Sequence, residues 1–579
     1  MFVADDPTLT GHAGMAISGE LLRKLRLVEV IDAELAAEGR VPPIKQRRRG
    51  ISPGALPVSI AECQMIGGDC FDDMQRMRDD RAGAVLRAVA DVPAAPTARQ
   101  LARKFRPGHI RAIERAAARC GNDLDRRLRR DMSEAVTLDL DALESVVYGH
   151  QKCGTGRSRC GHLAYNSFIV TWAQRGRGLT SELKGGNQAR ITASSSLAML
   201  TRAQRLLPKE HGQITVRADV GFYAAELMMG CRKRGMRFTL SAPRTCTMWV
   251  AVDDVRADAW QDAIDMRGAQ VAERPFTPQG WKHEQLRLII RRVQVTAAEL
   301  AATSPKARRR TTIPPQQLQM VLDGQLDSTY AYSFIVTDIP NSDTAASSNT
   351  VTSGATAANS DTAAASDTVT SGATAANSDT AAASDTVTNS AAAANSDTVT
   401  NSAAAANSDT VTSSDTAANS DTAANSSTTA KSEMSTIEVE YFHRHRAQIE
   451  ERFKDVKLGQ ALRHLPSGNL NANRLWLCSC VLALNITAWV CDISPAAGAS
   501  GISLDEEPSD EEPPDEEPRA RRRVKPQRRH AKTLRRLLFC VPGRIARSAR
   551  QITVHLPEGY RHIDLFNATY TAALTLPGP

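Results

Sequence analysis

A low-complexity tract in the second half of the chain is the feature that most constrains the fold. From Asn341 to about Ser432 the sequence repeats units such as NSDTAAA and SDTVTSGATAA, and it contains no Leu, Ile or aromatic residue. Without large apolar side chains to bury, such a segment cannot offset the entropy of ordering its backbone. We therefore predict that residues 341–435 are disordered, and that any folded core is built from the segments on either side.

Length and composition indicate a multidomain globular protein of a reducing compartment. The chain has 579 residues, more than a single core usually organises, with 42% hydrophobic and 23% charged residues. Its eleven cysteines are odd in number and have no repeated spacing, which argues against a secreted disulfide framework. The first residues show neither a basic start nor an apolar stretch, so no signal peptide is predicted. We expect a cytoplasmic protein.

One apolar run, Leu475 to Val490, approaches the length of a membrane span. It is shorter than the ~18 to 20 residues usually needed, and Asn485 and two cysteines interrupt it. The run therefore predicts a buried helix, and no membrane partner is expected.

Patterning and composition divide the rest of the chain into segments. Residues 1–130 show mainly helical periodicity, with short basic helices that could bind DNA, and residues 236–340 hold β-rich runs such as FTLSAP and TMWVAV. The predicted limits, in order, are a helical N-terminal domain 1–130, an α/β segment 131–235, an inserted β-rich subdomain 236–340, the disordered repeat 341–435, a helical segment 436–494, an acidic Pro-rich linker 495–518 and a basic C-terminal segment 519–579.

Two alternating runs carry carboxylates on one face of a predicted strand. In VTLDLDA, Asp139 and Asp141 lie opposite the apolar positions, and in ITVRAD the same holds for Arg217 and Asp219. Carboxylate oxygens are ligands that Mg²⁺ prefers, and two ions ~3.5 to 4 Å apart support in-line displacement at a phosphodiester. A single acidic residue at a strand edge is more often solvated or paired with Arg, so the evidence lies in the arrangement as a whole.

A third carboxylate occurs within a basic helical pattern after the tract. His443, Arg446, Glu450 and Lys457 have the spacing of the Y-x2-R-x3-E-x6-K signature, with His in place of Tyr. This pattern resembles the DDE transposases of bacterial insertion sequences. VRADVGFYAAEL, RHRAQIEERFKDVKLG and LPSGNLNANRLWL are similar to one branch of them, distantly similar to piggyBac. The resemblance implies an α/β fold with an RNase H-like catalytic core formed by residues 131–235 and 436–494.

The resemblance also implies roles for individual residues. The expected catalytic and metal-binding carboxylates are Asp141, Asp219 and Glu450. Asp141 is matched to the first aspartate of the branch's D-x-T segment, although Leu143 stands at the Thr position, and Asp139 remains the alternative. For the DNA phosphates, the resemblance points to contacts from Arg446 and Lys457.

The cofactor and partners follow from the same resemblance. Two Mg²⁺ or Mn²⁺ ions are expected, with double-stranded DNA as partner, both terminal inverted repeats and target, and a homo-oligomer as the active complex near the bacterial nucleoid. Two alternatives remain: a DNA-binding protein derived from a decayed element, and a host nuclease with the same core. Residues 519–550 are rich in Arg and Lys, which suits a phosphate backbone or a solvated helix face.

The register of the predicted helix distinguishes two neighbouring glutamates. If residues 443–457 form one continuous helix, then His443, Arg446, Glu450 and Lys457 share one face, and Glu451 points ~100° away. We therefore expect Glu450, and not Glu451, to reach the metal site.

Overall fold

The computed structural model describes residues 5–578 except 40–41, 48, 159–160, 188–191, 284, 302–304, 344–432, 448–455, 458, 495–529 and 549–550. Almost all of the tract predicted to be disordered, and the acidic linker 495–518, therefore lie outside the described residues. The chain is a mixed α/β protein, as the sequence predicts.

The alternating runs form the centre of a large mixed sheet. VTLDLDA opens β2 (Val136–Val146), ITVRA is β6 (Ile214–Ala218), and β6 is parallel to β2. On one side of β2 the sheet continues antiparallel through β4 (Leu163–Trp172) to β5 (Arg177–Gly185). On the other side, β7 (Met236–Ala242) lies parallel to β6. The two acid-bearing strands are thus direct neighbours. The short strand β3 (Gly156–Arg157) also pairs with β4.

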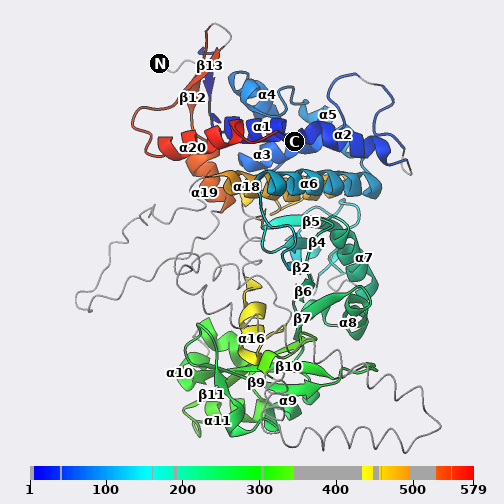
Figure 1. Cartoon of the computed structure of the whole chain (residues 1–579), viewed down its shortest axis with the longest axis vertical. Coiled ribbons are helices and arrows are strands. Elements are labelled where there is room, and N and C mark those ends of the chain that lie inside the picture. The colour runs from blue at the N-terminus through cyan, green and yellow to red at the C-terminus, as the bar shows by residue number, and fades with distance from the viewer. Residues whose placement is uncertain are drawn as a thin grey trace, which may run out of the picture.

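Residues of the predicted inserted subdomain continue the same sheet. The strands beyond β7 are all antiparallel to their neighbours, and in spatial order they are β11 (Ser328–Thr337), β10 (Leu286–Thr296), β9 (Ala269–Phe276) and β8 (Gln261–Asp262). The short helices in this part are α10 (Ala297–Leu300) and α11 (Pro315–Leu322). In Figure 1 the sheet descends from β5 through β4, β2, β6 and β7 to this end of the molecule.

One local prediction in this part is wrong. TMWVAV, expected to be a strand, lies within helix α9 (Cys246–Asp253). Met248 and Val252 are four residues apart on one helix face and pack into the core of the sheet. The Trp249 ring contacts the Phe334 ring, with 5.5 Å between the centroids, so Trp249 is a packing residue.

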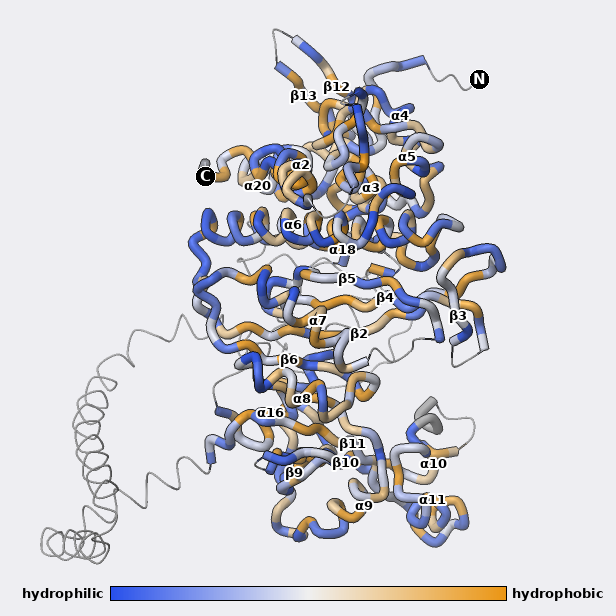
Figure 2. Tube along the Cα trace, turned by 90° about the vertical axis from the view of Figure 1, so that its right-hand side faces the viewer, coloured by the Kyte–Doolittle hydropathy of each residue, from blue (hydrophilic) through white to orange (hydrophobic). Residues whose placement is uncertain are grey.

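Helices cover both sides of the central strands. α7 (Ala193–Gln204) and α8 (Ala225–Arg232) pack on the side of Leu140 and Val216. α6 (Pro107–Arg127) and α18 (Leu470–Ile493) lie along β5, and Figure 2 shows hydrophilic and hydrophobic residues alternating along α6. α18 is long and apolar enough to cross a membrane, but 89% of its most apolar window is buried inside the protein. The buried helix predicted here is confirmed.

The predicted helical character of the N-terminal part is also confirmed. Its helices before α6 are α1 (Met15–Lys24), α2 (Leu27–Ala37), α3 (Ala55–Met65), α4 (Asp73–Asp79) and α5 (Ala95–Ala102). These helices share one hydrophobic core with α18 and with the C-terminal helices α19 (Ala531–Leu534) and α20 (Ile563–Leu574).

The two ends of the chain meet at this helical part (Figure 1). β1 (Leu9–Thr10) pairs with β12 (Gly543–Ser548), which pairs with β13 (Gln551–His555). Arg535, from the Arg- and Lys-rich residues 519–550, donates to the backbone oxygens of Gln64 at 2.8 Å and Met65 at 2.7 Å, so this arginine packs against α3.

The domain limits drawn from the sequence stay predictions.

A buried ionic network ties α6, β5 and α18 together. The Arg177 guanidinium donates to both carboxylate oxygens of Asp125 at 2.8 Å and to Asp492 Oδ2 at 2.7 Å. The three side chains are at most 4% exposed. Arg177 therefore neutralises two carboxylates that water does not reach.

We expect Arg177→Met to destabilise the protein by about 3 kcal/mol, because the two buried carboxylates lose one guanidinium partner and keep Arg130, 3.0 Å from each of them. Urea unfolding measures the loss. The matched control is Arg256→Met, whose partner Asp258 is 68% exposed; there the expected change is about 0 to 1 kcal/mol. Equal, small losses in the two variants would contradict the assignment.

The points where the chain enters and leaves the low-complexity tract lie side by side. The Met434 backbone N–H donates to the Pro340 carbonyl at 3.0 Å. Arg287 donates to the carbonyls of Ile339, Pro340 and Met434 at 2.9, 3.1 and 2.8 Å. The chain therefore resumes at the position where it left, and α16 (Thr436–Arg444) begins directly afterwards, capped by Ser435.

Replacing residues 344–432 by a Gly-Ser linker of about five residues should leave folding and DNA cleavage essentially intact, because the flanking contacts already close the gap. Thermal unfolding and a cleavage assay on the purified variant measure both. A soluble variant that unfolds like the wild type but no longer cleaves DNA would contradict this expectation.

Candidate active site

Asp141, within β2, and Asp219, directly after β6, lie next to each other on neighbouring strands of the sheet. β2 and β6 are parallel and pair in register up to Leu140 and Ala218, and the two aspartates are the next residues on each chain. Both carboxylates are partly exposed. The strand pairing thus brings together two predicted site residues that are far apart in the sequence.

Asp139 has a different environment from Asp141 on the same strand. Its carboxylate accepts two hydrogen bonds from Arg217, at 2.7 Å from Nε and 2.9 Å from Nη2. The Asp139 side chain is 4% exposed and that of Arg217 1%, whereas the Asp141 side chain is 14% exposed. Asp139 is therefore committed to a buried ion pair, and Asp141 is the more accessible carboxylate of the two.

Arg217 also fixes the segment that follows the tract. Its Nη1 donates to the Phe442 carbonyl at 2.7 Å, and its guanidinium lies 4.7 Å from the centre of the Phe442 ring. Phe442 is near the end of α16. Arg217 stands two residues before Asp219 in the sequence, but its partners come from distant segments, so no local pattern predicts its role.

The helix after the tract is shorter than predicted. α16 ends at Arg444, and Arg446 lies in a turn, so residues 443–457 do not form the single continuous helix expected from the motif. The buried contacts of Phe442 and His443 hold the end of α16 against the sheet. Glu450 lies outside the described residues, so its predicted orientation stays a prediction.

Arg446 nevertheless reaches the first aspartate. Its Nη1 lies 3.3 Å from Asp141 Oδ2. Lys457 also lies against β2, with Nζ 3.5 Å from the Glu144 carbonyl. Glu450, the third predicted carboxylate, lies outside the described residues, between these two positions in the sequence.

His443, which stands at the signature's Tyr position, is a buried anchor. Its ring nitrogens are 2.7 Å from Thr239 Oγ1 and 2.9 Å from Ser241 Oγ, both on β7. Burial, followed by the nearby charges of Arg446 and Arg217, lowers the pKa of His443 well below its ordinary value. The imidazole is therefore neutral at pH 7 and joins α16 to β7.

The carboxylates fit hard divalent cations. Asp141 Oδ1 accepts the Ala142 N–H at 2.7 Å, and Asp219 Oδ1 accepts the Gly221 N–H at 2.6 Å, so a backbone donor orients each group. Two partly exposed, negatively charged oxygen donors side by side are the ligand type that Mg²⁺ and Mn²⁺ take.

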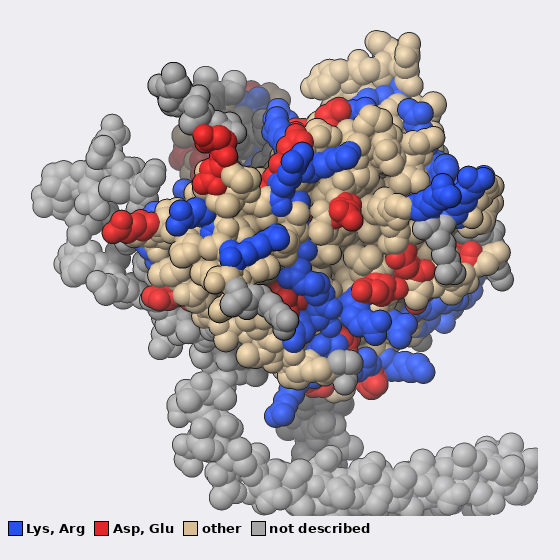
Figure 3. Space-filling model, turned by 90° about the horizontal axis from the view of Figure 1, so that it is seen from above, with Lys and Arg blue, Asp and Glu red and all other residues tan. Residues whose placement is uncertain are grey.

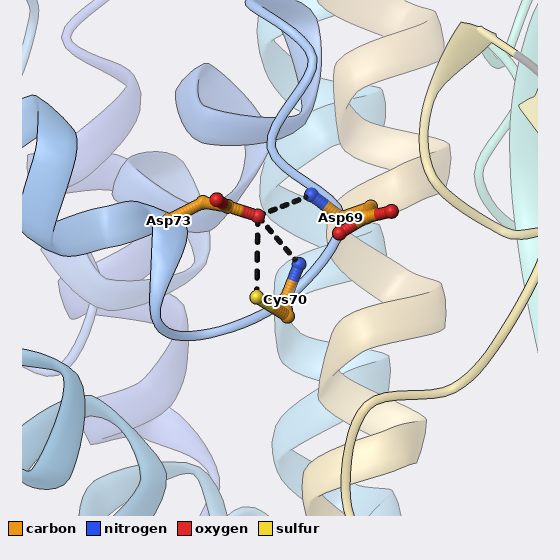
Figure 4. A group of neighbouring side chains, drawn as sticks. All are labelled: Asp69, Cys70 and Asp73. Atoms are coloured by element: carbon orange, nitrogen blue, oxygen red, sulfur yellow. Dashed lines mark hydrogen bonds between the residues drawn. The ribbon is translucent and has the colours of Figure 1, made fainter.

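A different group of potential ligands lies before α4. Asp73 Oδ2 accepts hydrogen bonds from the backbone N–H groups of Asp69 and Cys70, at 2.9 and 3.1 Å, and from Cys70 Sγ at 3.2 Å (Figure 4). Among the described residues this is the one cluster of three possible ligands close enough for an ion. Its central carboxylate folds the loop that leads into α4, so it has a local structural role.

Comparison with known proteins agrees with this geometry. A family described as Transposase DDE domain group 1 matches residues 5–304, more than half of the chain, and the matched region includes Asp141 and Asp219. No curated protein matches the chain. The chain belongs to the transposases with a DDE domain, group 1.

Proposed function

We propose that this transposase cuts DNA at the terminal inverted repeats of an insertion sequence and joins the freed 3′ ends to target DNA, with Asp141, Asp219 and Glu450 as catalytic residues. The observation that carries the proposal is the register of β2 and β6, which puts Asp141 and Asp219 at neighbouring positions. The position of Arg446 beside Asp141 supports it, because Glu450 follows Arg446 by four residues.

The sheet supports an RNase H-like core. Its central strands run β5, β4, β2, β6, β7, with β4 antiparallel to β2 and with β6 and β7 parallel to it. The carboxylates come from the two central strands, and the segment predicted to bear Glu450 follows α16, which is held against the same sheet.

Each residue has a separate role in the proposed reaction. Asp141, Asp219 and Glu450 hold two Mg²⁺ or Mn²⁺ ions. When bound, such ions activate a water or sugar hydroxyl and stabilise the leaving oxygen of the phosphodiester. Arg446 can bind a phosphate through two parallel hydrogen bonds, and Lys457 acts on it as a point charge. Arg217 holds the end of α16, and thereby Arg446, in place.

Transposases act on DNA, and this one is proposed to work as a homo-oligomer on duplex DNA in the bacterial cytoplasm, close to the nucleoid. The Arg446 Nη1 atom lies 3.3 Å from Asp141 Oδ2. The carboxylate and a DNA phosphate would therefore compete for the same guanidinium, and a divalent cation held by Asp141 would weaken the pull of that carboxylate on Arg446.

The experiment is a cleavage assay with purified protein and a duplex that carries the inverted repeats flanking the gene. Mg²⁺ should give cut ends, a target plasmid should give joined products, and EDTA should abolish both. Binding without cleavage would identify a decayed DNA-binding protein. Cleavage without joined products would identify a nuclease. Either result contradicts the proposal.

A further inference from the structure

A basic surface lies at the helical end of the molecule, on the opposite side of α6 and α18 from the carboxylates. A groove of about 1240 Å³ runs between α1, α2, the loop 45–52, the segment 78–94 and α5. We call it the helical-end groove. Figure 3 looks onto this end of the protein, where Lys and Arg side chains gather across the middle of the face.

The charge of the groove is strongly one-sided. Five cationic side chains line it against two acidic ones, Glu29 and Asp91. The cationic residues are Arg23, Lys45, Arg49, Arg78 and Arg81.

Two of these cations already have partners within the protein. Arg23 donates to Glu20 and to the Arg87 carbonyl, and Lys45 donates to the Ile51 carbonyl at 2.7 Å. Arg49, Arg78 and Arg81 are exposed, and none of them forms an ion pair with a residue that the structure describes. Three guanidinium groups are thus directed to solvent in one concave surface.

The remaining wall of the groove suits a sugar-phosphate backbone better than base edges. It consists of small and apolar side chains such as Val28, Ala84 and Val89, and no Asn or Gln lines the described groove. These wall side chains offer no hydrogen bond to a base edge, and an Arg contact to a phosphate oxygen is independent of the sequence.

We propose that the helical-end groove binds the phosphate backbone of duplex DNA, independently of sequence, through Arg49, Arg78 and Arg81. This inference rests on the proposed function, because that function makes duplex DNA the ligand. It adds a contact remote from the cut, where α6 and α18 separate it from Asp141 and Asp219 (Figure 1). The groove increases affinity for DNA, and the carboxylates carry the reaction.

The test is the triple variant Arg49→Ala, Arg78→Ala, Arg81→Ala, measured in EDTA with an inverted-repeat duplex and with a random duplex. The slope of log affinity against log salt should fall by roughly 2.7, from about 0.9 for each lost contact. Between 50 and 200 mM salt, the wild type should then lose about 40-fold more affinity than the variant. The effect should be equal for both duplexes, and cleavage of fully bound DNA should be unchanged.

Two controls make the result specific. Arg49→Lys, Arg78→Lys, Arg81→Lys keeps the charges and should keep the salt slope. Lys209→Ala, Lys233→Ala, Lys282→Ala removes three exposed charges from other surfaces and should leave the slope unchanged.

An unchanged slope in the alanine variant, or an effect on only one duplex, would overturn the inference while cleavage by the wild type still supports the proposed function. A wild type that binds neither duplex would overturn both. Thermal unfolding checks that the variants fold, since substitutions at exposed positions change stability little.

Discussion

Asp141→Asn should lower metal-dependent DNA cleavage by about a thousandfold or more, because a carboxylate that holds a catalytic ion accounts for several kcal/mol of transition-state stabilisation. The Asp141 side chain is 14% exposed and oriented by one backbone N–H, so its amide counterpart fits the same space. DNA binding in EDTA and the unfolding midpoint should stay close to those of the wild type. Single-turnover cleavage and urea unfolding measure the two effects.

Asp139→Asn is the matched control on the same face of the same strand. It leaves the Arg217 guanidinium, which is 1% exposed, without a negative partner. The expected loss of stability is about 3 to 5 kcal/mol. Any loss of cleavage should follow the fraction of unfolded protein and recover at lower temperature. A stable but inactive Asp139→Asn, or an active Asp141→Asn, would reverse the assignment of the first carboxylate.

Glu450→Gln should abolish metal-dependent cleavage to a similar extent, about a thousandfold, and leave inverted-repeat binding in EDTA unchanged. The substitution keeps the shape of the side chain and removes the charge that a cation needs. Glu450 follows Arg446 at the signature spacing, and Arg446 lies 3.3 Å from Asp141. Glu450→Asp keeps the charge but shortens the side chain, so it should bind the cation more weakly. The Mn²⁺ concentration that gives half-maximal cleavage should then be higher than for the wild type, which tests the metal-binding role directly.

Glu451→Gln is the control for that prediction, since the same change is made at the adjacent residue. It should cleave at a rate near that of the wild type. Both glutamates lie outside the described residues, so the experiment decides between them. An inactive Glu451→Gln beside an active Glu450→Gln would show that the signature is misaligned by one residue.

Much of the strand arrangement at the candidate site could be predicted from local sequence. Alternation over residues 136–142 and 214–219 predicts the two strands, because a side chain every second residue must face the same layer. The apolar run at 475–490 similarly predicts the buried helix α18. These patterns are local, because the side chains that an element buries follow a regular spacing within its own short stretch of sequence. The family resemblance added the choice of Asp141, Asp219 and Glu450.

The tertiary structure alone decided what each polar residue on those strands does. Asp139 and Asp141 look equivalent in the sequence, and they differ because Arg217, from another strand, pairs with one of them. TMWVAV forms a helix because its apolar face meets the sheet formed by β11 and β7. Arg287 joins residues on both sides of the tract. Each outcome depends on residues that are far apart along the chain, and no local pattern contains such partners. For Asp139 and Arg217, burial also makes an unpaired charge costly, so the two side chains pair with each other.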